Sequence, residues 1–112
     1  MGKGKVPGEF EQVVLLALAA GDGEVDGKSV YEQIVRTTGR EASVAAVYVT
    51  LARLEKKGHV ASRKGEPTPE RGGRAKKYFR LETAGAAAIM KSRQQLDSLW
   101  ESAKAHPRLR GS

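Results

Sequence analysis

The chain of 112 residues has no cysteine, so disulfide bonds and thiolate zinc sites are excluded. Long apolar segments are missing as well, because the longest run, residues 13–20, is far too short to cross a membrane. The basic, glycine-rich residues 1–8 are not followed by the apolar segment of a secretory signal. From these absences we expect a cytoplasmic protein without a membrane partner.

Residue combinations that perform catalysis or hold metal ions are also missing. The two histidines, His59 and His106, are far apart and lack cysteine or carboxylate partners at ligand spacing. Residues 22–27 (DGEVDG) match the start of a calcium-binding loop, but its last ligand position is Gln33 instead of a glutamate. Neither a nucleophile with its base nor a phosphate-binding glycine loop is recognisable. We therefore expect no enzyme and no cofactor, and we interpret residues 22–27 as an acidic turn.

The chain has an excess of positive charge. Twenty lysine and arginine residues stand against thirteen aspartate and glutamate residues, which gives a net charge of +7. In a chain long enough for one domain, such an excess favours a polyanionic partner, most often nucleic acid. The alternative is a basic soluble domain without such a partner.

Two helices are predicted in the first third of the chain. Residues 9–20 have apolar side chains at helical spacing, and Leu15 and Leu16 extend them to a second face. After the acidic turn, Asp26 or Ser29 can cap a second helix, which ends at Gly39. Its buried side chains are expected to be Val30, Tyr31 and Ile34.

A third helix, a hairpin and a closing helix complete the prediction. The third helix begins after the N-cap Ser43 and stops at Gly58. Strands over 59–66 and 76–82 are joined by a turn rich in proline and glycine, and Thr83 caps a helix to about residue 105. The inward stripe of the third helix is expected to comprise Val44, Val47, Tyr48, Leu51 and Leu54.

This order of elements predicts a mainly α fold with a β-hairpin wing, that is, a winged helix-turn-helix followed by a C-terminal dimerisation helix. The expected divisions are a flexible N-terminus (1–8), the winged helix-turn-helix (9–82), the dimerisation helix (83–105) and a flexible tail (106–112).

The outward face of the third helix is unusually bare. It carries Ala45, Ala46, Val49 and Arg53, which are small or basic, and long acidic side chains are missing. In a winged helix this helix enters the DNA major groove, where small side chains allow close approach and can touch thymine methyls. Together with the basic hairpin, the residues expected to contact double-stranded DNA are Lys28, Ser43, Ala45, Ala46, Tyr48, Val49, Thr50, Arg53, Arg71, Arg74, Lys76 and Lys77.

Two other interpretations of this face remain. Alanine is the best helix former, so an alanine-rich face also arises without any ligand. A winged helix can also be a protein-interaction module without specific DNA binding, although the basic hairpin argues against this.

Apolar residues on the first and last helices exceed what one small core can hide, which predicts a homodimer. In the closing helix they recur near a spacing of 3.5 residues. The expected interface comprises Phe10, Val14, Leu15, Ile89, Leu96, Leu99, Trp100 and Ala103. Trp100, the only tryptophan, is interpreted as a packing residue, with a site for an aromatic effector as the alternative.

Two motifs resemble those of the PadR-type transcriptional regulators. Residues 47–58 (VYVTLARLEKKG) are similar to the family pattern Leu-Tyr-x-x-Leu-x-x-Leu-Glu-x-x-Gly, with Val47 in place of the leucine. Residues 72–85 (GGRAKKYFRLETAG) resemble the family's wing and its strand-to-helix turn. The resemblance covers about residues 9–100 and implies a homodimeric repressor whose last helix crosses to the partner.

The resemblance also bears on contacts and regulation. The family often has Gly-Tyr where this chain has Gly27 and Lys28, so the lysine would supply a different contact to the DNA backbone. Some relatives release DNA when a flat aromatic compound binds near the dimer interface, which implies an effector site beside Trp100.

Overall fold

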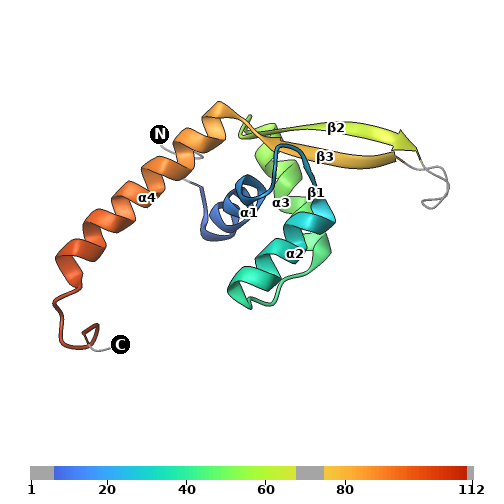
Figure 1. Ribbon diagram of the computed structural model, residues 1–112. Helices are drawn as coiled ribbons and strands as arrows, with labels where there is room; N and C mark the ends of the chain where they lie inside the picture. Colours follow the sequence, from blue (N-terminus) through green and yellow to red (C-terminus); the bar gives the residue numbers. More distant parts are fainter. Residues whose placement is uncertain (1–6, 68–74, 111–112) are drawn as a thin grey trace.

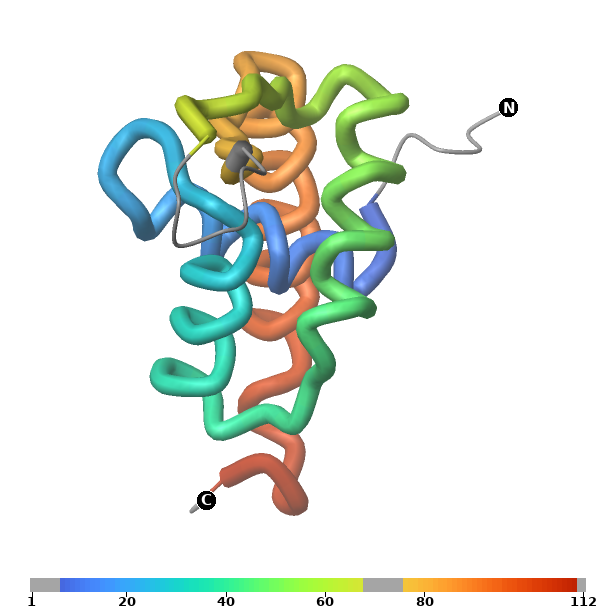
Figure 2. The backbone as a smooth tube through the Cα atoms, turned by 90° about the vertical axis from the view of Figure 1, so that its right-hand side faces the viewer, coloured from blue at the N-terminus to red at the C-terminus, as the bar shows by residue number. Residues whose placement is uncertain are grey.

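The computed structural model describes residues 7–67 and 75–110, which form four helices and a small sheet at one edge of the helical body. The elements in chain order are α1 (Glu9–Ala20), β1 (Val25–Asp26), α2 (Gly27–Thr38), α3 (Val44–Lys56), β2 (Val60–Pro67), β3 (Ala75–Leu81) and α4 (Thr83–Ala103). The predicted winged helix with an additional closing helix is therefore confirmed. Helices α2 and α3 lie side by side, α1 crosses behind them, and α4 lies on the far side of α1 (Figures 1 and 2).

Local signals determine most of the helix ends. Ser43 caps α3, because its side-chain oxygen accepts a hydrogen bond of 3.0 Å from the Ala46 N–H. Gly39 and Gly58 follow α2 and α3 with φ angles of 67° and 80°, the left-handed conformation that ends a helix. Of the two predicted caps of α2, Asp26 is the N-cap residue, and the hydroxyl of Ser29 donates to its Oδ1 at 2.7 Å.

The sheet has one strand more than predicted. Its order is β1-β3-β2, with both neighbouring pairs antiparallel. The two residues of β1 pair Val25 with Phe79 and Asp26 with Tyr78, so the former acidic turn is bound to the inner part of β3. The hairpin of β2 and β3 extends beyond this pairing and projects from the body as the wing (Figure 1).

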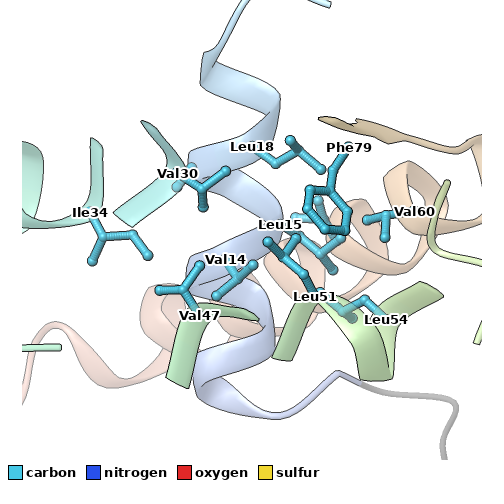
Figure 3. Packing of buried hydrophobic residues seen from close by; sticks show 12 residues of the cluster. Val14, Leu15, Leu18, Val30, Ile34, Val47, Leu51, Leu54, Val60 and Phe79 are labelled. Atoms are coloured by element: carbon cyan, nitrogen blue, oxygen red, sulfur yellow. The ribbon is translucent and has the colours of Figure 1, made fainter. Parts of the chain in front are cut away.

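The core is centred on α1 (Figure 3). Side chains from every helix and from strands β2 and β3 contribute to the cluster of Val14, Leu15, Ala17, Leu18, Val30, Ile34, Val47, Leu51, Leu54, Val60, Phe79 and Ile89. This arrangement corrects part of the predicted dimer interface, because Val14, Leu15 and Ile89 are buried within the single chain. The sheet and the first turns of α4 pack against α1, and Leu16 is the only large apolar side chain of this helix that stays half exposed.

Helix α4 is attached to the body only by its first half. A Cβ atom at Gly85 would lie 2.3 Å from the carbonyl oxygen of His59, so the backbone of α4 closely approaches the residue that precedes β2. Ile89 and Ser92 are still buried, but the remainder of the helix extends away from the body on the side opposite the wing (Figure 1). Among the helices of the described segments, none has both the length and the hydropathy of a membrane span.

An ion pair joins the start of α1 to the end of α3. Lys57 Nζ donates to both carboxylate oxygens of Glu11, at 2.9 and 3.0 Å, and the Glu11 side chain is 10% exposed. Burial raises the pKa of the Glu11 carboxyl, but hydrogen bonds from Lys57 and Gly8 and the charges of Lys57 and Arg53 outweigh it. The pKa of Glu11 therefore lies below its ordinary value of 4.5.

We expect Lys57→Met to lower the free energy of unfolding by about 1–3 kcal/mol at pH 7, because it leaves the Glu11 carboxylate buried without its cation. A lowered pKa stabilises the fold above pH 4.5 and loses this contribution as the pH falls through the folded-state value. The difference between the variant and the parent should therefore shrink from pH 7 to pH 3. Urea unfolding at both pH values measures it, with Lys56→Met on the exposed neighbouring lysine as control. An equal loss for both variants would contradict the proposed contribution of the ion pair.

Candidate nucleic-acid interface

The exposed side of α3 is formed by small hydrocarbon side chains. Val47, Leu51 and Leu54 are fully buried against the core, which turns Ala45, Ala46 and Val49 outward, with Val49 56% exposed. Arg53 lies exposed on the same helix near its C-terminal end. The structure thus brings four of the predicted DNA-contacting residues together on one solvent-facing side.

The packing of α3 corrects the predicted inward stripe. Thr50 is only 4% exposed, whereas Val44 and Tyr48 are each 37% exposed. The buried side is centred on Val47 and Leu54, and with 3.6 residues per turn this places Thr50 inside and Tyr48 at the edge. Thr50 therefore leaves the set of candidate DNA contacts.

Tyr48 is held against the beginning of α2. A Cβ atom at Gly27 would lie 2.5 Å from two of its ring carbons and 2.9 Å from its hydroxyl oxygen, so only glycine leaves room for the ring. The ring also meets Phe79 edge-on, with centroids 6.5 Å apart. The hydroxyl of Tyr48 thus lies next to the N-terminus of α2 and near the exposed Lys28. Backbone N–H groups at a helix start, a hydroxyl and a lysine are the donors that typically contact phosphates.

Much of the wing's charge is paired within the chain. Arg63 contacts Glu24 at 2.6 Å, Arg80 contacts Glu82 at 3.0 Å, and Lys77 lies 3.8 Å from Glu55. The guanidinium of Arg63 also lies over the ring of Tyr78, 5.0 Å from its centroid. The sequence prediction missed this involvement of Arg63 and Arg80, because Glu24, which contacts Arg63 and also lies 3.9 Å from Arg80, is distant from both in the chain.

Lysines of the wing remain available for an anion. Lys64 and Lys77 are directly opposite each other on β2 and β3 and share one face of the hairpin. Lys64 and Lys76 have no ion-pair partner among the described residues. Arg71 and Arg74, predicted for the tip of the wing, lie outside the described residues.

The predicted interface residues of α4 form one exposed apolar stripe. Leu96, Leu99 and Trp100 are 53%, 66% and 51% exposed, and Ala103 continues the stripe. Phe10 of α1 is partly buried under the guanidinium of Arg40, at 5.1 Å. The sequence prediction missed an apolar groove of about 250 Å³ between α1 and α2, lined chiefly by Val13, Leu16, Ala17, Ala20, Ile34 and Thr37.

Solved structures share the fold along most of the chain. A transcriptional regulator from Clostridium thermocellum has a TM-score of 0.70 at 20% identity, with 87% of this chain and 88% of that chain covered. A PadR family regulator from Clostridium difficile has a TM-score of 0.69 at 18% identity, with coverages of 88% and 97%. BpsR of Bordetella bronchiseptica, whose DNA binding is regulated by 6-hydroxynicotinic acid, has a TM-score of 0.68 at 17% identity, with coverages of 96% and 74%.

Sequence comparison identifies the family. Curated proteins give no significant match. The model of the transcriptional regulator PadR-like family, however, matches residues 15–91, which is well over half of the sequence. The chain therefore belongs to the PadR-like family of transcriptional regulators, which bind DNA and are not enzymes.

Proposed function

We propose that the protein is a homodimeric repressor that binds a pseudo-palindromic operator with α3 in the major groove. The observation that supports this most directly is the bare outward side of α3, where Ala45, Ala46 and Val49 allow close approach to base edges. The proposed phosphate contacts are Lys28 at the start of α2, Tyr48 of α3 beside it, Arg53 on α3, Ser43 at the cap of α3, and Lys76, Lys77, Arg71 and Arg74 on the wing.

The proposed dimer is supported by apolar surfaces that one chain leaves uncovered. The stripe of Leu96, Leu99 and Trp100 lies on the part of α4 that projects from the body. The groove between α1 and α2 is a matching apolar surface, with Leu16 46% exposed. In the proposed twofold arrangement each α4 packs on the α1 of the other chain. Half-site centres would then lie about 10 or 20 base pairs apart.

Selection from a random pool of duplex DNA, followed by footprinting, tests this function. We expect an inverted repeat to be enriched and protected, with binding that weakens as salt rises. Six phosphate contacts would reduce the affinity about a thousandfold between roughly 50 and 200 mM salt. If the winged helix is instead a protein-interaction module, no sequence will be enriched. A salt-insensitive interaction would contradict the phosphate contacts.

We further propose that a planar aromatic effector binds beside Trp100 in the dimer. BpsR, which has the same fold, is regulated by the aromatic compound 6-hydroxynicotinic acid. In a twofold dimer the two Trp100 side chains would approach a common axis, and Ala103, the next residue of the stripe on α4, is small. Two indoles with small neighbours can separate to admit a flat ring that stacks between them.

Tryptophan fluorescence tests the effector proposal, since Trp100 is the only tryptophan. Titration with planar aromatic acids, 6-hydroxynicotinic acid among them, should quench the emission saturably and lower operator affinity over the same concentration range. The ligand must bind more tightly to a dimer conformation that does not fit the operator than to the conformation that does. A ligand with equal affinity for both conformations would leave their equilibrium unchanged. If a broad panel of aromatic compounds leaves both signals unchanged, Trp100 only packs in the interface.

A further inference from the structure

Polar side chains that normally recognise bases are missing from the first turns of α3. The outward residues there are Val44, Ala45, Ala46 and Val49, followed by Ala52, and all of them end in hydrocarbon. The polar residues of this segment do not extend from the middle of this side. Ser43 accepts the Ala46 N–H, Thr50 is buried, and Tyr48 packs against Gly27.

The first outward side chain able to donate to a base edge is Arg53. It lies nine residues after Val44, which corresponds to about 13 Å along the helix. The N-terminal half of α3 therefore presents an apolar surface and no side-chain donor or acceptor to a major groove. This surface is rigidly placed, because Ser43 caps the helix and Val47 and Leu51 anchor it in the core.

We infer that α3 recognises the C5-methyl groups of pyrimidines by hydrocarbon contact, centred on Val49. The C5-methyl of thymine is the apolar group that the major groove displays, and small apolar side chains contact it. Val49 is the most exposed large apolar residue of α3 and lies in the middle of the bare side. 5-Methylcytosine carries a methyl group at the equivalent ring position, so the same surface responds to methylated cytosine.

This inference rests on the proposed DNA binding and adds to it the chemical group of the bases that α3 recognises, which is the C5-methyl group. Hydrogen-bonding residues distinguish bases through bidentate pairs, whereas a hydrocarbon surface discriminates by the presence or absence of a methyl group. The sequence preference of the N-terminal half of α3 is therefore for thymine at defined positions of each half-site. Arg53 and the wing are left to position the protein on the backbone.

The test uses the sequence obtained by selection and replaces each thymine in turn by deoxyuridine, which removes the methyl group and keeps every hydrogen-bonding atom. At one to three positions in each half-site we expect the dissociation constant to rise about fourfold, the value of one buried methylene-sized group. Placing cytosine at such a position should weaken binding, and 5-methylcytosine should recover part of the loss. If 5-methylcytosine binds no better than cytosine at that position, α3 recognises the methyl group of thymine only and does not respond to methylated cytosine.

Val49→Ala provides the matching change in the protein. In this variant, replacing thymine by deoxyuridine at one position should no longer raise the dissociation constant appreciably, whereas the rise at the other positions should be unchanged. Such non-additivity in a double-mutant cycle would show that Val49 and that methyl group are in contact. Val35→Ala on the exposed side of α2 is the control, and it should leave every penalty intact. If the protein binds its operator specifically but deoxyuridine has no effect at any position, the inference of methyl recognition is wrong and the proposed DNA-binding function stands. If no DNA sequence is bound specifically, the proposed function fails together with it.

Discussion

Ala46→Glu is expected to abolish specific DNA binding, with a loss of affinity of about 100-fold or more. Ala46 lies on the outward side of α3, where a carboxylate would face the phosphates and the electronegative base edges of the groove. Like-charge contacts in a closely fitted interface cost several kcal/mol. Gel-shift titration against the selected operator measures the loss, and binding to random duplex DNA should weaken as well.

The substitution is suited to this test because it should not harm folding. Ser43 is the N-cap and Ala46 the third residue of α3, so a glutamate there completes a capping box and adds a negative charge at the helix start. Ala87→Glu on the exposed, opposite side of α4 introduces the same charge away from both proposed interfaces, and it should bind almost normally. If Ala46→Glu binds the operator as tightly as the parent chain, α3 does not enter the groove.

Leu96→Glu is expected to convert the dimer into monomers at tens of micromolar. Leu96 is the first residue of the exposed stripe of α4, between the buried Ile89 and the exposed Leu99. Burying a carboxylate there in place of an apolar side chain, once in each chain, should raise the dimer dissociation constant about 100-fold or more. Sedimentation velocity detects the change in mass. Operator affinity should fall with it, because a monomer contacts one half-site only.

Folding of the single chain should survive Leu96→Glu, since Leu96 is not part of the core. Gln94→Glu, two residues earlier and on the opposite side of α4, is the matched control and should remain dimeric. A parent protein that is monomeric at these concentrations, or a Leu96→Glu variant that stays dimeric, would refute the proposed interface.

The elements of this PadR-like regulator could be predicted from sequence wherever a local signal determines them. The apolar period of α1 predicted its bounds, and Ser43, Gly39 and Gly58 marked helix ends, because capping depends on neighbours within four residues. Strand β1 could not be predicted in this way. Its two residues are too short for a period, and they form a strand only because the edge of β3 supplies partners that lie more than fifty residues later.

The same distinction applies to the candidate site. The bare face of α3 followed from the order of residue types, since a helix with one apolar stripe must turn its other residues to solvent. The rotation of that helix depended on α1 and the sheet, which placed Thr50 inside and Tyr48 against Gly27. Arg63 and Arg80 acquired a common partner, Glu24, only after the strands had paired.

The sequence by itself determined the order of elements, the basic character and the stripe of α4, because each depends on residue type and spacing along the chain. Only the tertiary structure decided which apolar residues remain for a partner. Val14 and Leu15 on α1 had the same apolar character as Leu96 and Leu99 on α4. The other helices and the sheet cover the first pair completely, whereas α4 leaves the body after Ser92 and carries the second pair into solvent. Burial is a property of the surrounding elements, so spacing along one helix cannot reveal it.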